Sequence, residues 1–185
     1  CRDLTSFENL EQIISEAFFS VSEEVKSAAS YALGSIAIGN LQQYLPFILT
    51  EDEHEPRRQY LLLHSLKEVI VCLSSSPEGI QQLLPFVPAI WDTLYRHCES
   101  QEEGTRNVVS ECLGKLTLID PTHLLPKLQE SLGSSSPLMR TTIVTAIKFT
   151  ISDQVCRIVE NRKIAVINLF VVAGFYRPAV ASMHW

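Results

Sequence analysis

Two pairs of neighbouring carboxylates are the first candidates for chemistry in this chain of 185 residues. They are Glu23–Glu24 and Glu102–Glu103. Paired carboxylates can serve as general acid and general base. Each pair here falls in the first turn of a predicted helix, where negative charge stabilises the positive end of the helix dipole. A structural role is therefore favoured over catalysis at both pairs.

Histidine and cysteine side chains are the next candidates, for a nucleophile or a metal site. His97 and Cys98 are adjacent, but neighbouring residues on a helix point about 100° apart and do not face each other. The acidic loop Glu51–Glu55 contains His54, yet consecutive carboxylates rarely converge on one cation, so a solvated loop is favoured. His64 lies in an apolar helical segment, where a core-edge or surface histidine is favoured over a ligand. We expect no catalytic, cofactor-binding or metal-binding residues.

Motifs, net charge and cysteine usage further limit the classes of function that the sequence favours. No G-x-S-x-G, P-loop, G-x-G-x-x-G or H-E-x-x-H motif is present, so we do not expect an enzyme. The formal net charge of -6 argues against direct nucleic-acid binding, because phosphate contacts need an excess of Lys and Arg. None of the five cysteines forms a C-x-x-C pair, which favours a reduced, intracellular protein. Cys72 and Cys112 lie in apolar helical segments, where a free thiol acts as a small hydrophobe.

Four ungapped ten-residue segments resemble one another, which indicates an internal repeat. They span residues 25–34, 58–67, 105–114 and 139–148. The eighth position of each is small, and the ninth is a large aliphatic residue that recurs at spacings of 33, 47 and 34 residues. The ninth positions are Leu33, Leu66, Leu113 and Ile147. Apolar residues at i, i+4 and i+8 form one stripe of a helix. Helix pairs with such faces bury them only by stacking, so the pattern predicts an all-α, HEAT/armadillo-like solenoid.

Proline residues mark the first helix of three predicted pairs. Pro46, Pro85 and Pro126 precede the last three repeat segments at similar places. An interior proline removes a backbone hydrogen bond and bends the helix. We therefore expect these prolines to help curve the stack.

Capping residues mark the predicted helix starts. One group has an N-cap side chain followed by proline at the first helical position, as in Ser76-Pro77, Asp120-Pro121 and Ser136-Pro137. A second group fits the S/T-x-x-E capping box. Its members are Ser20/Glu23, Thr50/Glu53 and Ser100/Glu103.

These signals predict one array, residues 1–154, and a tail, residues 155–185. The array contains four antiparallel helix pairs and no sheet. The pairs cover about residues 7–38, 41–74, 77–118 and 121–152. The tail is apolar and carries no repeat, and its run Ile164–Tyr176 is too short for a membrane span, which needs about 20 residues. Because the chain opens with Cys1, we expect it to be a piece of a longer protein.

Several long stretches resemble one known family. They are Glu23–Ile36, Arg58–Glu68, Glu102–Val109, Glu111–Pro121 and Thr145–Asp153. In these stretches the chain resembles the cullin-associated, neddylation-dissociated proteins, also called TBP-interacting proteins, over about residues 7–154. The second, more tissue-restricted paralogue looks nearer than the ubiquitous one. The resemblance implies an internal piece of the C-terminal half of a large HEAT solenoid.

The same resemblance implies a function and partners. Family members wrap a cullin–RING core that lacks its ubiquitin-like modifier and exchange substrate-receptor modules on SCF-type ubiquitin ligases. This implies a scaffold in the nucleus and cytoplasm that regulates ligase assembly. The family's other name leaves a transcription-linked adaptor that binds the TATA-binding protein as the alternative.

The match to the family stops near Gln154. The chain continues with Val155–Lys163 and ends in Met183–Trp185, without another repeat. We expect an alternative transcript end or a retained intron at this junction. Sequencing of transcripts across it checks this expectation, which a normal continuation in every transcript would contradict.

Exposed faces of second helices usually line the inner curve of a solenoid. On this basis we expect six residues to face a partner. They are Lys26, Tyr31, Lys67, Glu68, Lys115 and Lys148. Four arginines near second-helix starts are expected to bond carboxylates of neighbouring helices, with partner contact as the alternative. They are Arg57, Arg58, Arg106 and Arg140.

Overall fold

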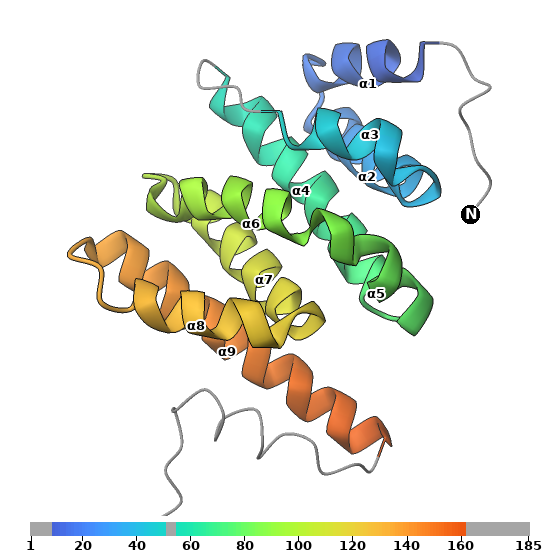
Figure 1. The fold of residues 1–185 in the computed structure, drawn as a ribbon. Helices are drawn as coiled ribbons and strands as arrows, with labels where there is room; N and C mark the ends of the chain where they lie inside the picture. The colour runs from blue at the N-terminus through green and yellow to red at the C-terminus, as the bar shows by residue number, and fades with distance from the viewer. Residues whose placement is uncertain (1–8, 51–54, 162–185) are drawn as a thin grey trace, which may run out of the picture.

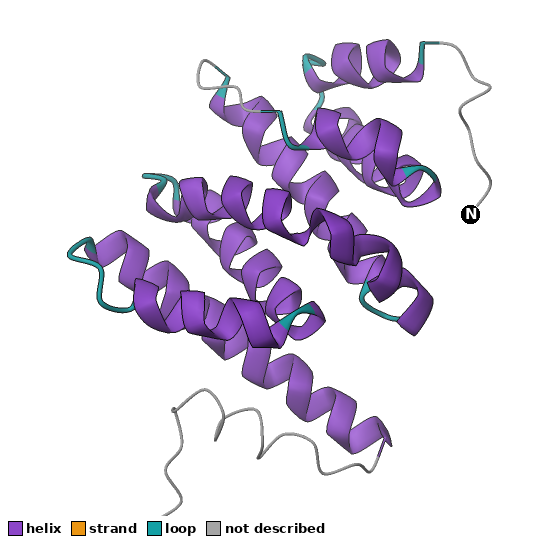
Figure 2. Ribbon diagram, viewed as in Figure 1, coloured by secondary structure: helices purple, strands orange, loops and turns teal. Residues whose placement is uncertain are grey.

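The computed structural model describes residues 9–50 and 55–161, with side chains described as far as Asp153. Every regular element in these ranges is a helix, and no strand occurs among them (Figure 2). The all-α class predicted from the repeat pattern is therefore confirmed.

Four helix pairs follow one another along the described chain (Figure 1). The first pair is α1 (Leu10–Phe18) and α2 (Glu23–Gly39). The second is α3 (Leu41–Ile48) and α4 (Pro56–Leu73). The fourth is α8 (Pro121–Ser131) and α9 (Pro137–Asn161).

The third pair has a divided first helix. Its parts are α5 (Pro77–Leu83), the 3₁₀ turn η1 (Leu84–Phe86) and α6 (Val87–Arg96), followed by the turn η2 (His97–Glu99). The second helix of this pair is α7 (Glu103–Ile119). The sequence pattern predicted one continuous first helix here. Because Pro85 cannot donate a backbone hydrogen bond, the helix tightens into η1 at that residue.

The helices form two layers (Figure 1). One layer holds the first helices α1, α3, α5–α6 and α8, and the other holds the second helices α2, α4, α7 and α9. Consecutive second helices pack directly on each other, α2 on α4, α4 on α7, and α7 on α9. The predicted solenoid architecture is confirmed.

The ninth repeat positions form the centre of the core. Leu33, Leu66 and Leu113 are fully buried, whereas Ile147 is only partly buried. Ile147 lies on α9, the last described helix, which has a neighbour on one side only in the described part of the chain.

Besides Pro85, the two other recurrent prolines, Pro46 and Pro126, lie inside α3 and α8 as expected.

The structure separates the two groups of predicted caps. Those that precede proline are confirmed, since Ser76 Oγ accepts a hydrogen bond from the Gly79 amide at 3.0 Å, and Asp120 and Ser136 accept equivalent bonds. The capping boxes at Ser20 and Ser100 are wrong. Each hydroxyl accepts a hydrogen bond from the amide two residues later, at 3.2 and 3.3 Å, in a turn that precedes the helix.

The N-caps of the corresponding helices lie closer to the helical residues. Ser22 caps α2 by accepting a hydrogen bond from the Val25 amide, whereas Glu102 occupies the N-cap position of α7 without a side-chain capping bond. The third predicted capping box is wrong as well, because Glu55 occupies the N-cap of α4 and Thr50 donates back to the carbonyl of Pro46. Glu53 lies outside the described residues.

Helix α9 extends beyond the residue where the repeat pattern ends. The pattern predicts a helix end near residue 152, and α9 runs to Asn161. The predicted boundary between array and tail therefore falls inside a helix. The apolar run Ile164–Tyr176 and the terminal Met183–Trp185 lie outside the described residues.

Candidate functional site

The six residues expected to face a partner all lie on the layer of second helices. Lys26 and Tyr31 are on α2, Lys67 and Glu68 on α4, Lys115 on α7 and Lys148 on α9. Tyr31 and Lys148 are exposed, and the other four are partly buried. The site is therefore a surface that runs across consecutive second helices and not a single cleft.

Three of the lysines on this surface are engaged in ion pairs within the chain. Lys67 Nζ lies 2.6 Å from Glu111 on α7, and Lys115 Nζ lies 2.6 Å from Asp153 on α9. Lys26 pairs with Glu23 in its own helix at 2.9 Å. The first two contacts therefore join neighbouring helices, whereas the third lies within α2.

The arginines divide into two structural roles. Arg57 pairs with Glu23 across α4 and α2, which matches the expectation of a neighbouring carboxylate. Arg106 and Arg140 do not follow that expectation. Each donates through Nη1 to two carbonyl oxygens of the loop before its own helix, at 2.6 and 3.0 Å for Arg106 and at 2.7 and 2.9 Å for Arg140. Free loop carbonyls lie nearer to these guanidinium groups than any described carboxylate.

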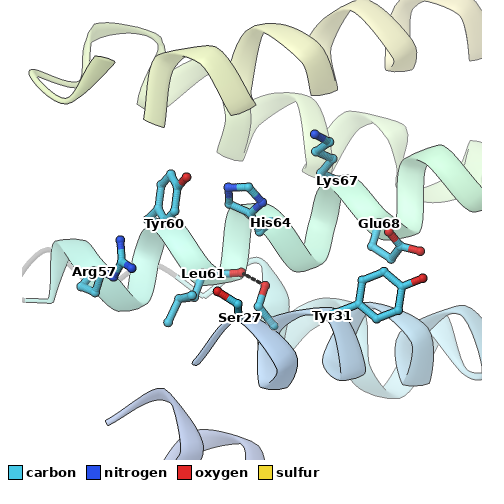
Figure 3. A pocket seen from close by; sticks show the side chains of 9 residues that line it. Ser27, Tyr31, Arg57, Tyr60, Leu61, His64, Lys67 and Glu68 are labelled. Atoms are coloured by element: carbon cyan, nitrogen blue, oxygen red, sulfur yellow. Dashed lines mark hydrogen bonds between the residues drawn. The ribbon is translucent and has the colours of Figure 1, made fainter. Parts of the chain in front are cut away.

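A pocket of about 390 Å³ opens on this surface between α2 and α4 (Figure 3). Tyr31, Lys67 and Glu68, three of the expected residues, line it. The remaining lining residues are Ser27, Ser30, Arg57, Tyr60, Leu61 and His64. Tyr60, His64 and Lys67 project from one face of α4 (Figure 3), because residues three or four apart share a helix face.

The pocket floor is fixed by hydroxyl groups at the α2–α4 contact. Ser30 Oγ donates to the carbonyl oxygen of Leu61 at 2.8 Å, and Ser65 Oγ donates to that of Ser30 at the same distance. Both serines are buried. The two helices are therefore held in register directly beneath the pocket.

His64 forms an uncharged part of the pocket wall. Its ring meets that of Tyr60 edge to face at a centroid distance of 4.5 Å, and its buried Nε2 has no hydrogen-bond partner. Burial and the nearby Lys67 ammonium lower the pKa of His64 below its usual value. The imidazole is uncharged near neutral pH and leaves the charge balance of the pocket to Arg57, Lys67 and Glu68.

Sequence reasoning missed this grouping. Tyr60 was not singled out, and His64 was assessed alone as a core-edge or surface residue. The spacing of Arg57, Tyr60, His64 and Lys67 along one helix face is the signal that could have found them. The contribution of Ser27 from α2 depends on the packing of the two helices and has no local signal.

The cysteines do not provide a nucleophile in the described core. Burial, with the Glu99 carboxylate, raises the pKa of Cys98 to about 12, and its thiol lies 3.6 Å from the carbonyl oxygen of Leu94. Cys112 is fully buried, and its pKa is also raised to about 12. Cys72, expected to be a core hydrophobe, is exposed instead.

Two other features bear on the early candidates. Most of the acidic loop with His54 lies outside the described residues. None of the described helices combines the length and the apolar character that a membrane crossing requires.

The described fold and surface define a class of protein, an α-solenoid segment of the HEAT type whose second helices carry a polar, aromatic-lined surface.

Comparison with known proteins identifies the family. The chain is 62% identical over 152 residues to cullin-associated NEDD8-dissociated protein 1 of Drosophila melanogaster, across 82% of this chain and 12% of that protein. It is 50% identical over 153 residues to the protein of the same name from Arabidopsis thaliana, across 83% and 12%. It is 47% identical over 145 residues to cullin-associated NEDD8-dissociated protein 2 of Mus musculus, across 78% and 11%. No family model matches the chain.

This chain belongs to the family of cullin-associated NEDD8-dissociated proteins. It spans about 12% of the length of the relatives just described. The family expected from the sequence is confirmed.

Proposed function

We propose that this chain contributes one section of a HEAT scaffold that binds cullin–RING cores lacking the ubiquitin-like modifier and promotes exchange of substrate-receptor modules. The observation that carries the proposal is the 62% identity to a cullin-associated protein over 82% of the chain. The stacked second helices supply the kind of extended surface that solenoids use for binding. We propose that the protein acts as a non-enzymatic scaffold and works in the nucleus and cytoplasm.

The identities bear on the choice of paralogue. Relatives named protein 1 reach 62%, and those named protein 2 from mouse and rat reach 47%. These values do not support the expected assignment to the second paralogue. We propose instead that the chain groups with the relatives named protein 1.

The partner-facing residues also remain a proposal, which the ion pairs refine. Tyr31 and Lys148 are exposed, and no ion pair involving either is found among the described residues. We propose that these two contact a partner directly. Lys67 and Lys115 are proposed to act mainly by holding neighbouring helices together.

A binding experiment tests the proposed function. This chain, and a form extended by the flanking family sequence, are each used to capture purified cullin–RING cores with and without the modifier. We expect the extended form to retain only the unmodified core. Failure to bind either core contradicts the proposal, and capture of the TATA-binding protein in that case supports the adaptor alternative.

Two variants of the extended form test the proposed contacts. Tyr31→Ala and Lys148→Glu are expected to weaken capture of the unmodified core. Glu130→Gln, on the opposite layer, serves as the control. Equal capture by all three variants excludes these two residues as contacts.

A further inference from the structure

The charges around the pocket between α2 and α4 do not all have partners. The Arg57 guanidinium pairs with Glu23, which also pairs with Lys26, and the Lys67 ammonium pairs with Glu111. The Glu68 carboxylate has no ion-pair partner among the described residues. The pocket therefore offers one carboxylate that is not matched by a cation of the described chain.

The two tyrosine rings of the pocket also differ in whether a cation already lies over them. Arg57 already lies over the Tyr60 ring, with its Cζ atom 5.3 Å from the ring centroid. The Tyr31 ring is 61% exposed, and no described ring or cation stacks on it. Tyr31 and Glu68 lie next to each other at the same end of the pocket (Figure 3).

An unmatched carboxylate beside an open aromatic face has the chemistry that attracts a cation. The face of a tyrosine ring attracts a positive charge, and guanidinium is the cation that most often stacks there. Its planar fork also donates two parallel hydrogen bonds to one carboxylate. An ammonium group satisfies the charge but neither the stacking nor the fork.

The occupant must also suit the rest of the pocket. A guest carboxylate would meet Glu68 and would compete with Glu23 or Glu111 for cations that are already paired. His64 adds no positive charge, because its pKa is lowered. The chain as a whole carries a net charge of -6, which favours a basic partner surface.

We propose that this pocket accepts an arginine side chain of a partner protein, with the guanidinium paired to Glu68 and stacked on Tyr31. The identity of the partner, an unmodified cullin–RING core, rests on the proposed function, whereas the chemistry of the pocket does not.

Small probes test the chemistry of the pocket without a partner protein. N-acetyl-arginine amide, N-acetyl-citrulline amide and N-acetyl-glutamate amide are titrated into the 185-residue chain, while the ring signals of Tyr31 and His64 are followed by NMR. Citrulline has the shape of arginine without its charge. We expect saturable shifts with arginine and affinities about tenfold weaker for citrulline.

Two matched variants test whether arginine binds at Glu68. Glu68→Gln is expected to lower the arginine affinity about tenfold. Glu24→Gln, an exposed position of α2 away from the pocket lining, is expected to leave it unchanged. Equal shifts with arginine and citrulline, tighter binding of glutamate, an unchanged affinity in Glu68→Gln, or no shift at all overturns the proposal.

A parallel experiment tests whether the cullin–RING core supplies the arginine that the pocket binds. The extended form carrying Glu68→Gln is tested for capture of the unmodified core and is expected to capture less than the Glu24→Gln form. If arginine binds the pocket but both forms capture the core equally, the cullin is excluded as the source of the arginine. If the unaltered extended form captures no core, the proposed function fails while the probe titration still decides the pocket chemistry.

Discussion

A Cβ atom at Gly114 would lie 2.7 Å from the carbonyl oxygen of Ala146, so α7 and α9 approach each other at a distance that only glycine permits. The corresponding position two repeats earlier is Gly34, where a Cβ atom would lie 2.8 Å from the carbonyl oxygen of Ser65. Both glycines end a ten-residue repeat segment. The second helices are thus packed through close backbone contacts at two equivalent places.

Replacement of Gly114 by alanine is expected to destabilise the fold by about 1–3 kcal/mol, because the added methyl overpacks a contact made partly by backbone. The higher helix propensity of alanine offsets at most about 1 kcal/mol. Gly104→Ala is the matched control. Its Cβ atom would meet nothing nearer than Tyr60 at 3.6 Å, and we expect a neutral or slightly stabilising change. Urea unfolding measures both, and equal midpoints would contradict the close-packing argument.

Removal of the Thr142 hydroxyl is expected to cost about 1–2 kcal/mol of unfolding free energy in Thr142→Val. This buried hydroxyl donates to the Cys98 carbonyl oxygen at 2.8 Å and so joins α9 to η2. Thr141→Val is the control, since that exposed hydroxyl bonds only within its own helix, to Pro137. Chemical unfolding measures the loss of unfolding free energy in each of the two variants. A loss as large in Thr141→Val shows that helix propensity and not the bridge sets the effect.

Acidification is expected to destabilise the chain through His64. Its pKa is lowered in the folded state, so the unfolded chain binds more protons near pH 6. This contribution to stability is full above the unfolded pKa of about 6.5 and is lost as the pH falls through the folded value. The loss of unfolding free energy between pH 7.5 and 5.5 is therefore expected to be smaller in His64→Gln than in the unaltered chain. Identical losses would rule out His64 as the group responsible.

Thiol reactivity is expected to separate Cys72 from two other cysteines. Cys72 is exposed, whereas burial raises the pKa of Cys98 and Cys112 to about 12 and suppresses their thiolates. Iodoacetamide labelling of the folded chain, followed by peptide mass analysis, should modify Cys72 well before either of the others. In urea all three should react at similar rates. Early modification of Cys112 in the folded chain would contradict its position in the core.

The ion pair between Lys67 and Glu111 is expected to couple α4 and α7 only weakly. Both side chains are partly exposed, at 32% and 22%, so solvent screens their attraction. A double-mutant cycle with Lys67→Met and Glu111→Gln is expected to give a coupling free energy of about 0.5–1 kcal/mol in low salt. Added salt should reduce it. A coupling that does not change with salt would point to packing of the side chains.

The sequence predicted the architecture well because the repeat encodes packing locally. Leu33, Leu66 and Leu113 recur at one repeat position, and all three are fully buried. Proline-linked caps were also predictable, since proline at the first helical position fixes where the helix begins. The capping boxes failed because Ser20 and Ser100 satisfy the same four-residue pattern while bonding the amide two residues later.

The candidate site was predictable only in part. Exposure of second-helix residues follows from the helical period, and Tyr31 and Lys148 are exposed as that period suggests. The partners of Lys67 and Lys115 lie 44 and 38 residues away, at Glu111 and Asp153. No local pattern gives such pairings.

By itself, the sequence determined the class of fold, the order of the helix pairs and the core positions Leu33, Leu66 and Leu113, because burial in a repeat follows from spacing along each helix. Only the tertiary structure decided which charges are paired and where a pocket opens. Those features depend on the distance and register between neighbouring second helices. Between α2 and α4 these are set by the close contact at Gly34 and by the buried hydroxyls of Ser30 and Ser65. The unmatched Glu68 beside the open Tyr31 ring is therefore a property of the stack and not of either helix alone.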